Sequence, residues 1–415
     1  MFNIKKTLKD NRVLLKNNIA LTITSVIEKI LLLLTAVFLA RYLGVADYGK
    51  WGLVLSFCAI ISIINDYGLR IDMMRKISKS FSKIKTEIGN VMILSVIIST
   101  ALIIITIFLP SAILDGEIKS LCIVILAAGI FNGVSGALMN TFSAKQMMEY
   151  NSFVRVASAT LMIIGYLGVI FFHQGLMALA IVTLINRALI SIIVMFLVRK
   201  KFSINTLIIK PEMWKSLLLS AIPFTIGFAI SRIYFKIDMV MMSWMNTGDF
   251  QLGLYNATTN IIVNLQFLPL TFGYTIFPIL SSLSMTSKSF VEKYNRYIKI
   301  SLAIVLPIAI IIALFPSLIL NIIFGKSYET GALSLRILSL FLLFSAVTIV
   351  QKNRLSATGH QKLIIKVMFA GIILNILMNL YFIKAFGYVG ASITTVISEF
   401  VTMVIFTILI MRMKD

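Results

Sequence analysis

Charged side chains interrupt several long apolar stretches of this 415-residue chain. Glu28, Lys29, Arg187, Arg232 and Glu399 each fall near the middle of such a stretch. If the stretches cross a bilayer, each charge costs at least about 2.5–3.5 kcal/mol at mid-depth, so it should face a partner or a water-filled cavity. The sequence therefore predicts a polar interior inside an apolar protein.

Most of these deep charges are cationic, and two cations share a helical face. Arg232 and Lys236 are four residues apart, so a helix stacks both side chains on one side. Guanidinium groups suit phosphate oxygens because their donors form a rigid fork. We therefore expect a substrate pathway for an anion, lined by Lys29, Arg187, Arg232 and Lys236.

Carboxylates in the same stretches admit two roles. They could take up a proton or Na⁺ that drives transport, or they could neutralise basic residues between helices, and the sequence leaves both open. These carboxylates are Glu28, Asp66, Asp238 and Glu399. Cations nearer the ends of the stretches have a simpler explanation, since long basic side chains reach the membrane surface. These cations are Arg70, Arg155 and Arg336.

Neutral polar residues in the stretches suit either the hydroxyl groups of a bound substrate or hydrogen bonds between helices, the latter worth about 0.6–2 kcal/mol each. They are Asn132, Asn140, Asn186, Asn260, Asn264, Gln266, Asn375 and Asn379.

Residues for catalysis or metal binding do not cluster in the sequence. His173 and His360 stand apart in expected loops, Cys58 and Cys122 are isolated in apolar stretches, and no phosphate-binding glycine loop is present. The sequence therefore predicts that the protein is neither an enzyme nor an ATP-driven pump, and that it holds no metal site and no disulfide.

The elements that must hold the charged residues are membrane-spanning helices. The chain is 59% hydrophobic and 13% charged, and a bilayer core of about 30 Å needs about 20 apolar helical residues to cross it. Since the runs are solidly apolar rather than alternating, they predict helices and not barrel strands. The expected spans lie near 18–40, 48–69, 89–110, 120–143, 154–172, 176–198, 215–245, 253–281, 298–323, 332–355, 363–384 and 391–411.

The net charge of +22 follows from membrane topology and not from nucleic-acid binding. Basic residues gather before the first span and after the second, sixth, eighth and tenth, whereas the intervening loops are short and hold few cations. This alternation predicts twelve spans with both termini in the cytoplasm. Because no loop is long enough for a separate domain, any function must lie within the bundle or at its surfaces.

A weak internal match divides the chain into halves. Gly49-x-Trp51 follows the first expected span, and Gly253-x-Tyr255 follows the seventh. Since both spans start on the same side, the match predicts a parallel repeat of two pseudo-symmetric six-helix bundles, residues 1–207 and 208–415.

The same segments resemble a known family. The run Ala40-Arg41-Tyr42-Leu43-Gly44-Val45-Ala46-Asp47-Tyr48-Gly49 resembles the signature between the first two helices of polysaccharide exporters. In the second half the resemblance rests on Ala221-Ile222-Pro223, Arg232, Asp238, Gly253-Leu254-Tyr255, Leu268-Pro269 and Phe277-Pro278-Ile279-Leu280-Ser281. Over essentially the whole chain, these motifs resemble the Wzx-type flippases of the multidrug/oligosaccharidyl-lipid/polysaccharide exporter superfamily.

That resemblance implies a pair of bundles that open alternately to each side of the bacterial inner membrane. It implies translocation of an undecaprenyl-pyrophosphate-linked oligosaccharide to the outer leaflet, for O antigen, lipopolysaccharide or another surface polysaccharide. The implied partners are this lipid-linked oligosaccharide, membrane lipid, a polysaccharide polymerase and a chain-length regulator, with H⁺ or Na⁺ coupling and no cofactor or nucleic acid.

Two alternatives remain open. A drug/cation antiporter of the same superfamily would favour acidic residues in its cavity, and a membrane polysaccharide polymerase would ordinarily present a sizeable outer loop.

Overall fold

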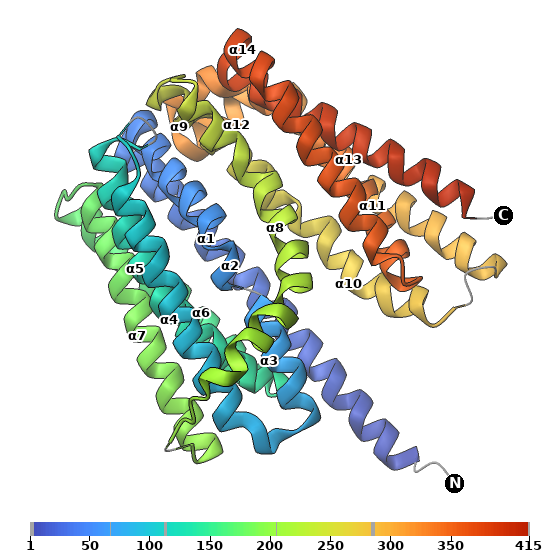
Figure 1. The fold of residues 1–415 in the computed structure, drawn as a ribbon. Helices are drawn as coiled ribbons and strands as arrows, with labels where there is room; N and C mark the ends of the chain where they lie inside the picture. The colour runs from blue at the N-terminus through green and yellow to red at the C-terminus, as the bar shows by residue number, and fades with distance from the viewer. Residues whose placement is uncertain (1–3, 67, 112–113, 205, 284–286, 414–415) are drawn as a thin grey trace. The chain divides into compact units, whose positions relative to one another are not determined.

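The computed structural model describes residues 4–66, 68–111, 114–204, 206–283 and 287–413, and these are almost entirely helical (Figure 1). Within these ranges, nine helical stretches are long and apolar enough to cross a membrane. The prediction of an all-α membrane protein is therefore confirmed.

The helices follow one another with short connections. They are α1 Ile4–Ile61, α2 Ile63–Asp66, α3 Gly68–Lys79, α4 Ile84–Phe108, α5 Gly116–Ala144, α6 Met148–Phe171, α7 Leu176–Phe202, α8 Trp214–Trp244, α9 Asp249–Leu265, α10 Phe267–Ser281, α11 Lys288–Leu314, α12 Pro316–Phe324, α13 Ala332–Ala357 and α14 Gln361–Arg412. Short 3₁₀ turns cover Phe81–Lys83, Pro211–Met213 and Lys326–Gly331.

Glycines allow two of these helices to contain two expected spans each. α1 is two helices joined at Gly44, where φ is 73°, and α14 is two helices joined at Gly387, where φ is 56°. Only glycine enters this left-handed region at little cost. The connections expected between these spans, residues 41–47 and 385–390, are therefore reduced to turns about one glycine. The span expected at 253–281 is instead divided, with α9 ending just before Gln266 and α10 beginning just after it.

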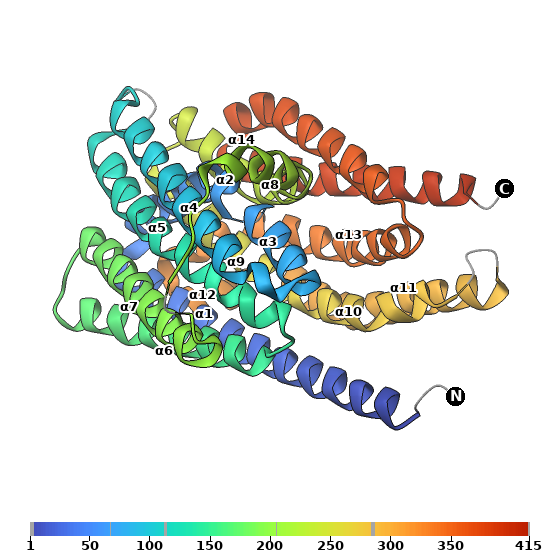
Figure 2. The same cartoon turned by 60° about the horizontal axis from the view of Figure 1, so that its bottom comes forward.

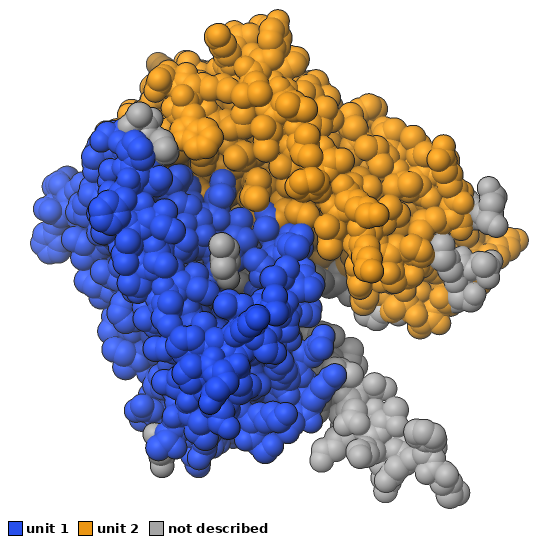
Figure 3. Space-filling view, viewed as in Figure 1, with its two compact units in different colours: residues 1–39, 57–229 blue, residues 40–56, 230–415 orange. Residues whose placement is uncertain are grey.

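The described helices form two compact units, coloured separately in Figure 3. Unit 1 comprises residues 1–39 and 57–229, and unit 2 comprises residues 40–56 and 230–415. These ranges differ from the expected halves, 1–207 and 208–415, because segment 40–56 packs with unit 2 and the first part of α8 packs with unit 1. The boundaries of the sequence repeat stay a prediction.

Unit 1 is built around α5, which packs against α4 and α7. Its core is apolar and closely packed, with Met73, Ile88, Val91, Phe142 and Val194 fully enclosed. Because lipid tails are as apolar as these side chains, close packing rather than exclusion from water holds such helices together.

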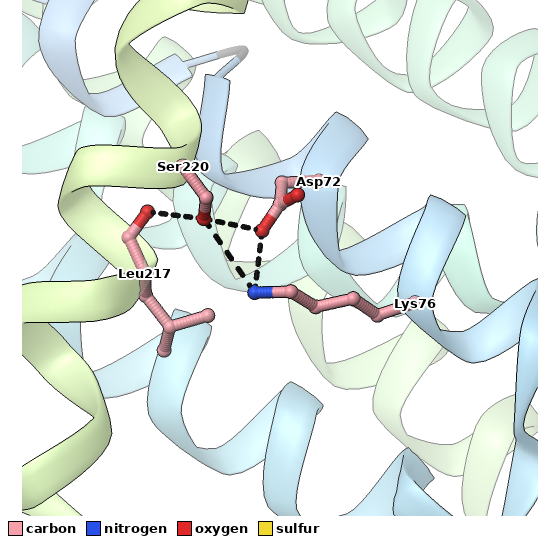
Figure 4. A network of polar contacts seen from close by, with 4 residues as sticks. All are labelled: Asp72, Lys76, Leu217 and Ser220. Carbon is pink, nitrogen blue, oxygen red and sulfur yellow. Dashed lines mark hydrogen bonds and ion pairs between the residues drawn. The ribbon is translucent and has the colours of Figure 1, made fainter.

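Hydrogen bonds fasten the start of α8 to α3 within unit 1 (Figure 4). The Ser220 hydroxyl donates to Asp72 Oδ2 at 2.7 Å, and Lys76 Nζ lies 2.6 Å from the same oxygen. The connection that precedes α8 is held as well, because Asn90 Oδ1 accepts from Lys210 N and from Trp214 Nε1, both at 2.9 Å. The link between the two halves of the sequence is thus fixed to unit 1.

Two glycines bring the second half of α1 against α9 within unit 2. A Cβ on Gly49 would lie 2.3 Å from Asp249 O, and a Cβ on Gly253 would lie 1.8 Å from Val45 O. Asn256 Nδ2 donates to Tyr48 O at 3.1 Å beside this crossing. The matching glycines of the internal repeat therefore pack against each other, where only a hydrogen atom fits.

The remainder of unit 2 is a layer of long helices. α13 lies between α11 and α14 and contacts both, as the two views agree (Figures 1 and 2). Ile276, Phe290, Val350 and Phe406 form the buried core among these helices and α10.

Candidate functional site

A polar cavity of about 170 Å³ opens inside unit 1. Five helices line it, α1, α3, α5, α6 and α7. Its polar lining consists of Glu28, Arg70, Asn132, Ser135, Arg155, Ser158 and Arg187. The apolar lining consists of Leu32, Met139, Val154, Ala159, Met162 and Ile190, with Gly136 between them.

Glu28 and Arg155 form an ion pair across the cavity wall. Arg155 Nη2 donates to Glu28 Oε2 at 2.5 Å, which joins α6 to α1. This contact is of the inter-helix pairing kind that the sequence allowed for Glu28, and the role of Glu28 in ion coupling or pairing stays a prediction.

Arg70 is buried in the cavity wall, with 9% of its surface exposed. Its Nη1 lies 3.5 Å from Asn132 O on α5. The guanidinium occupies space that a side chain at Gly136 would fill, because a Cβ there would lie 1.7 Å from Nη1. The glycine thus makes room for a buried cation.

Arg187 enters the cavity from α7, and its neighbour in sequence fixes that helix to α6. Asn186 Oδ1 accepts from Ser158 Oγ at 3.2 Å, and Asn186 Nδ2 donates to Ser158 O at 3.2 Å. This two-way contact sets the register between the helices that carry Arg155 and Arg187.

The charge balance of the cavity favours an anion. Its lining holds three guanidinium groups and one carboxylate, and the carboxylate already pairs with Arg155. Coulombic attraction is several times stronger at the reduced dielectric of a protein interior than in water. The cavity can therefore bind an anion with forked donors, and it disfavours a cation.

The structure distributes the four predicted cations over both units. Arg187 lines the cavity of unit 1. Lys29 follows Glu28 on α1 but is not part of the cavity lining. Arg232 and Lys236 belong to the portion of α8 in unit 2.

Arg70 and Arg155 differ from their expected role. Both were assigned to the membrane surface because they fall near the ends of apolar stretches, yet both line the cavity. Their partners, Asn132 and Glu28, come from other helices, and a single sequence does not display such contacts. Arg336 is exposed, and its Nε donates to Ala313 O at 3.0 Å.

Asp238 stands at the centre of a neutral polar network in unit 2. Its Oδ2 accepts from Tyr255 Oη at 2.5 Å and from Thr395 Oγ1 at 2.8 Å, while its Oδ1 accepts from Asn379 Nδ2 at 2.6 Å. Asn379 in turn bonds Asn375 Oδ1 at 3.1 Å. Among the described residues no cationic side chain contacts Asp238, and its hydrogen bonds come from hydroxyl and amide groups.

The two remaining carboxylates of the predicted set are Glu399 and Asp66. Glu399 is 5% exposed, and its Oε2 accepts from Tyr234 Oη at 2.6 Å. The side chain of Asp66 lies outside the described residues.

The chain resembles proteins of polysaccharide assembly over most of its length. The family model "Polysaccharide biosynthesis protein" matches residues 14–284. The probable low-salt glycan biosynthesis flippase Agl15 of Haloferax volcanii is 23% identical over 93% of this chain and 81% of its own. The Shigella flexneri protein named "Putative O-antigen transporter" is 25% identical over 56% of each chain.

Solved structures share the fold at lower sequence identity. The lipid II flippase MurJ in an inward closed conformation matches with a TM-score of 0.80 at 16% identity, covering 94% of this chain and 87% of that one. An inward-facing MATE-family multidrug transporter matches with a TM-score of 0.74 at 17% identity, covering 93% and 94%. The fold is therefore that of the MATE and MurJ transporters. Because the family model covers well over half of its residues, the chain belongs to the polysaccharide biosynthesis protein family.

Proposed function

We propose that this protein flips an undecaprenyl-pyrophosphate-linked oligosaccharide repeat unit from the cytoplasmic to the outer leaflet of the bacterial inner membrane. The observation that carries the proposal is the gathering of Arg70, Arg155 and Arg187 in one cavity of unit 1. The pyrophosphate is the part of such a substrate with the highest free-energy cost of entering the hydrocarbon core of the bilayer. The forked donors of guanidinium groups match its oxygens.

Binding in this cavity would lower the barrier to crossing by replacing water around the phosphates. Arg187 supplies a guanidinium that is not committed to the Glu28 pair. Arg155 holds Glu28 through one nitrogen, so its remaining donors stay available for an anion. A drug/cation antiporter would require the opposite charge balance, which weakens that alternative.

The energy would come from a cation taken up at Asp238. Glu28 is paired with Arg155, and Glu399 shares a cavity lining with Lys352. Asp238 instead accepts from Tyr255, Thr395 and Asn379, groups that can turn to accept as well as donate. A proton or Na⁺ bound there would neutralise a carboxylate in the membrane interior, which favours binding.

The proposal is tested in cells by removing one cation of the cavity. We expect Arg187→Ala to reduce surface polysaccharide about 10- to 100-fold and to accumulate the lipid-linked repeat on the cytoplasmic face, because one charge-assisted contact is lost. Arg187→Lys should retain part of the activity, since it keeps the charge but loses the fork.

Arg336→Ala is the matched control, because Arg336 lies at the surface of α13 and outside the cavity. All variants are compared at equal abundance in the membrane. Normal polysaccharide in Arg187→Ala would contradict the role of the cavity.

A further inference from the structure

A second polar cavity lies inside unit 2, apart from the Asp238 network. Its volume is about 200 Å³, and α8, α10, α13 and α14 enclose it. Its polar lining includes Tyr234, Gln266, Thr348, Lys352, Glu399 and Thr402. Such a set of polar groups inside a membrane bundle is costly unless each group finds a partner.

Hydrogen-bonding capacity is left over in this cavity. Gln266, Glu399 and Thr402 are 6%, 5% and 3% exposed, so bulk water does not reach them freely. Within the described part of the chain, Thr402 Oγ1 is buried without a hydrogen-bond partner. Tyr234 Oη satisfies one oxygen of Glu399.

A basic and an acidic side chain line the cavity without pairing. Lys352 and Glu399 both belong to its lining, and within the described ranges they form no salt bridge with each other. The space between them therefore suits a molecule that can accept from an ammonium group and donate to a carboxylate.

The lining favours a ligand without net charge. An anion would gain from Lys352 what it loses at Glu399, a cation the reverse, and an apolar molecule would leave these groups unpaired. Hydroxyl groups both donate and accept, so an uncharged molecule with several hydroxyls satisfies Glu399, Lys352 and Thr402 together. Phe235 also lines the cavity and offers an apolar ring to pack against.

We propose that this cavity binds one sugar ring of the transported oligosaccharide, with Glu399 accepting from its hydroxyls and Lys352 and Thr402 donating to its oxygens. The volume equals that of about seven water molecules, which is room for a single ring and not for a whole repeat unit. The inference rests on the proposed function and adds a position at which sugar identity is read.

The test measures the affinity of the full-length protein in nanodiscs for two lipids. One is undecaprenyl pyrophosphate without sugar, and the other is the same lipid carrying the oligosaccharide, extracted from the native cells. We expect wild type to bind the sugar-bearing lipid more tightly. Glu399→Gln and Thr402→Val should each weaken that binding roughly 10-fold. Both should leave the affinity for the bare lipid unchanged, which also shows that the variants are folded.

The matched control is Thr106→Val in unit 1, which removes a buried hydroxyl whose hydrogen bond, among the residues that the structure describes, is to Leu102 O of its own helix. It should retain the preference for the sugar-bearing lipid. An unchanged preference in both cavity variants, with normal binding of bare lipid, would overturn the sugar site alone. Failure of the wild type to bind either lipid would overturn the proposed function and the sugar site with it.

Discussion

The packing of Gly253 against Val45 makes a sharp prediction about Gly253→Ala. The added methyl would lie 1.8 Å from Val45 O, 2.7 Å from Val45 C and 2.8 Å from Val45 Cγ1. Two of these atoms belong to the backbone, so a change of rotamer cannot relieve the clash. The second half of α1 and α9 would have to separate by more than about 1 Å to restore ordinary contact distances.

The expected cost follows from two opposing effects. Overpacking against backbone costs about 3 kcal/mol, the upper part of the usual range, and alanine in a helix returns about 0.5–1 kcal/mol. We therefore expect Gly253→Ala to lose about 2 kcal/mol of unfolding free energy. Gly129→Ala is the matched control, because Gly129 is also inside a helix, α5, and has no atom within 4 Å of the added methyl. It should be neutral or stabilising by up to about 1 kcal/mol.

The two variants are compared by unfolding the purified protein in mixed micelles of increasing denaturing-detergent content, followed by circular dichroism. The midpoint for Gly253→Ala should fall well below wild type, while that for Gly129→Ala should stay level or rise. Equal midpoints for the two variants would refute the contact between the repeat glycines.

Three further predictions concern the polar sites. Gly136→Ala should displace the Arg70 guanidinium and reduce transport with little change in stability, because the clashing atoms, Nη1, Cζ and Cδ, all belong to the long side chain of Arg70 and not to backbone. Wild-type transport at equal abundance would contradict this role for Gly136. Asn90→Ala removes the acceptor for Lys210 N and Trp214 Nε1 and should cost about 1–3 kcal/mol. Loss of these bonds should free the segment before α8, so trypsin should cleave faster between Arg199 and Lys215. An unchanged cleavage rate would contradict the role of Asn90 in holding this segment. Asp238→Asn should abolish any rise in melting temperature caused by Na⁺ or by lowered pH, because a ligand stabilises only the form that binds it; a rise as large as in wild type would exclude Asp238 as the coupling group.

The sequence alone predicted the helical membrane fold because each span carries its own signal. Composition and run length identify a spanning helix without knowledge of its neighbours. Turns were harder to predict, since α1 and α14 are each interrupted at a single glycine, Gly44 and Gly387, where connections of several residues were expected.

The candidate site was predictable only in part. The cost of a charge inside an apolar stretch drew attention to Glu28, Arg187 and Asp238. Glu28 and Arg187 line the cavity of unit 1, and Asp238 accepts from Tyr255, while the roles of all three stay predictions. The partners were not predictable, because Glu28 meets Arg155 and Asp238 meets Asn379 only through the packing of distant helices. For the same reason Arg70 was assigned to the surface, while Gly136 on another helix provides its buried position.

The most direct test of the account is translocation by the purified protein in liposomes. A fluorescent undecaprenyl-pyrophosphate-linked oligosaccharide and a cationic dye are supplied in parallel to wild type and to Arg187→Ala. We expect wild type to move the lipid-linked oligosaccharide between leaflets, Arg187→Ala to move it at least about 10-fold more slowly, and neither protein to transport the dye. Dye transport by wild type without movement of the lipid-linked oligosaccharide would contradict the central claim.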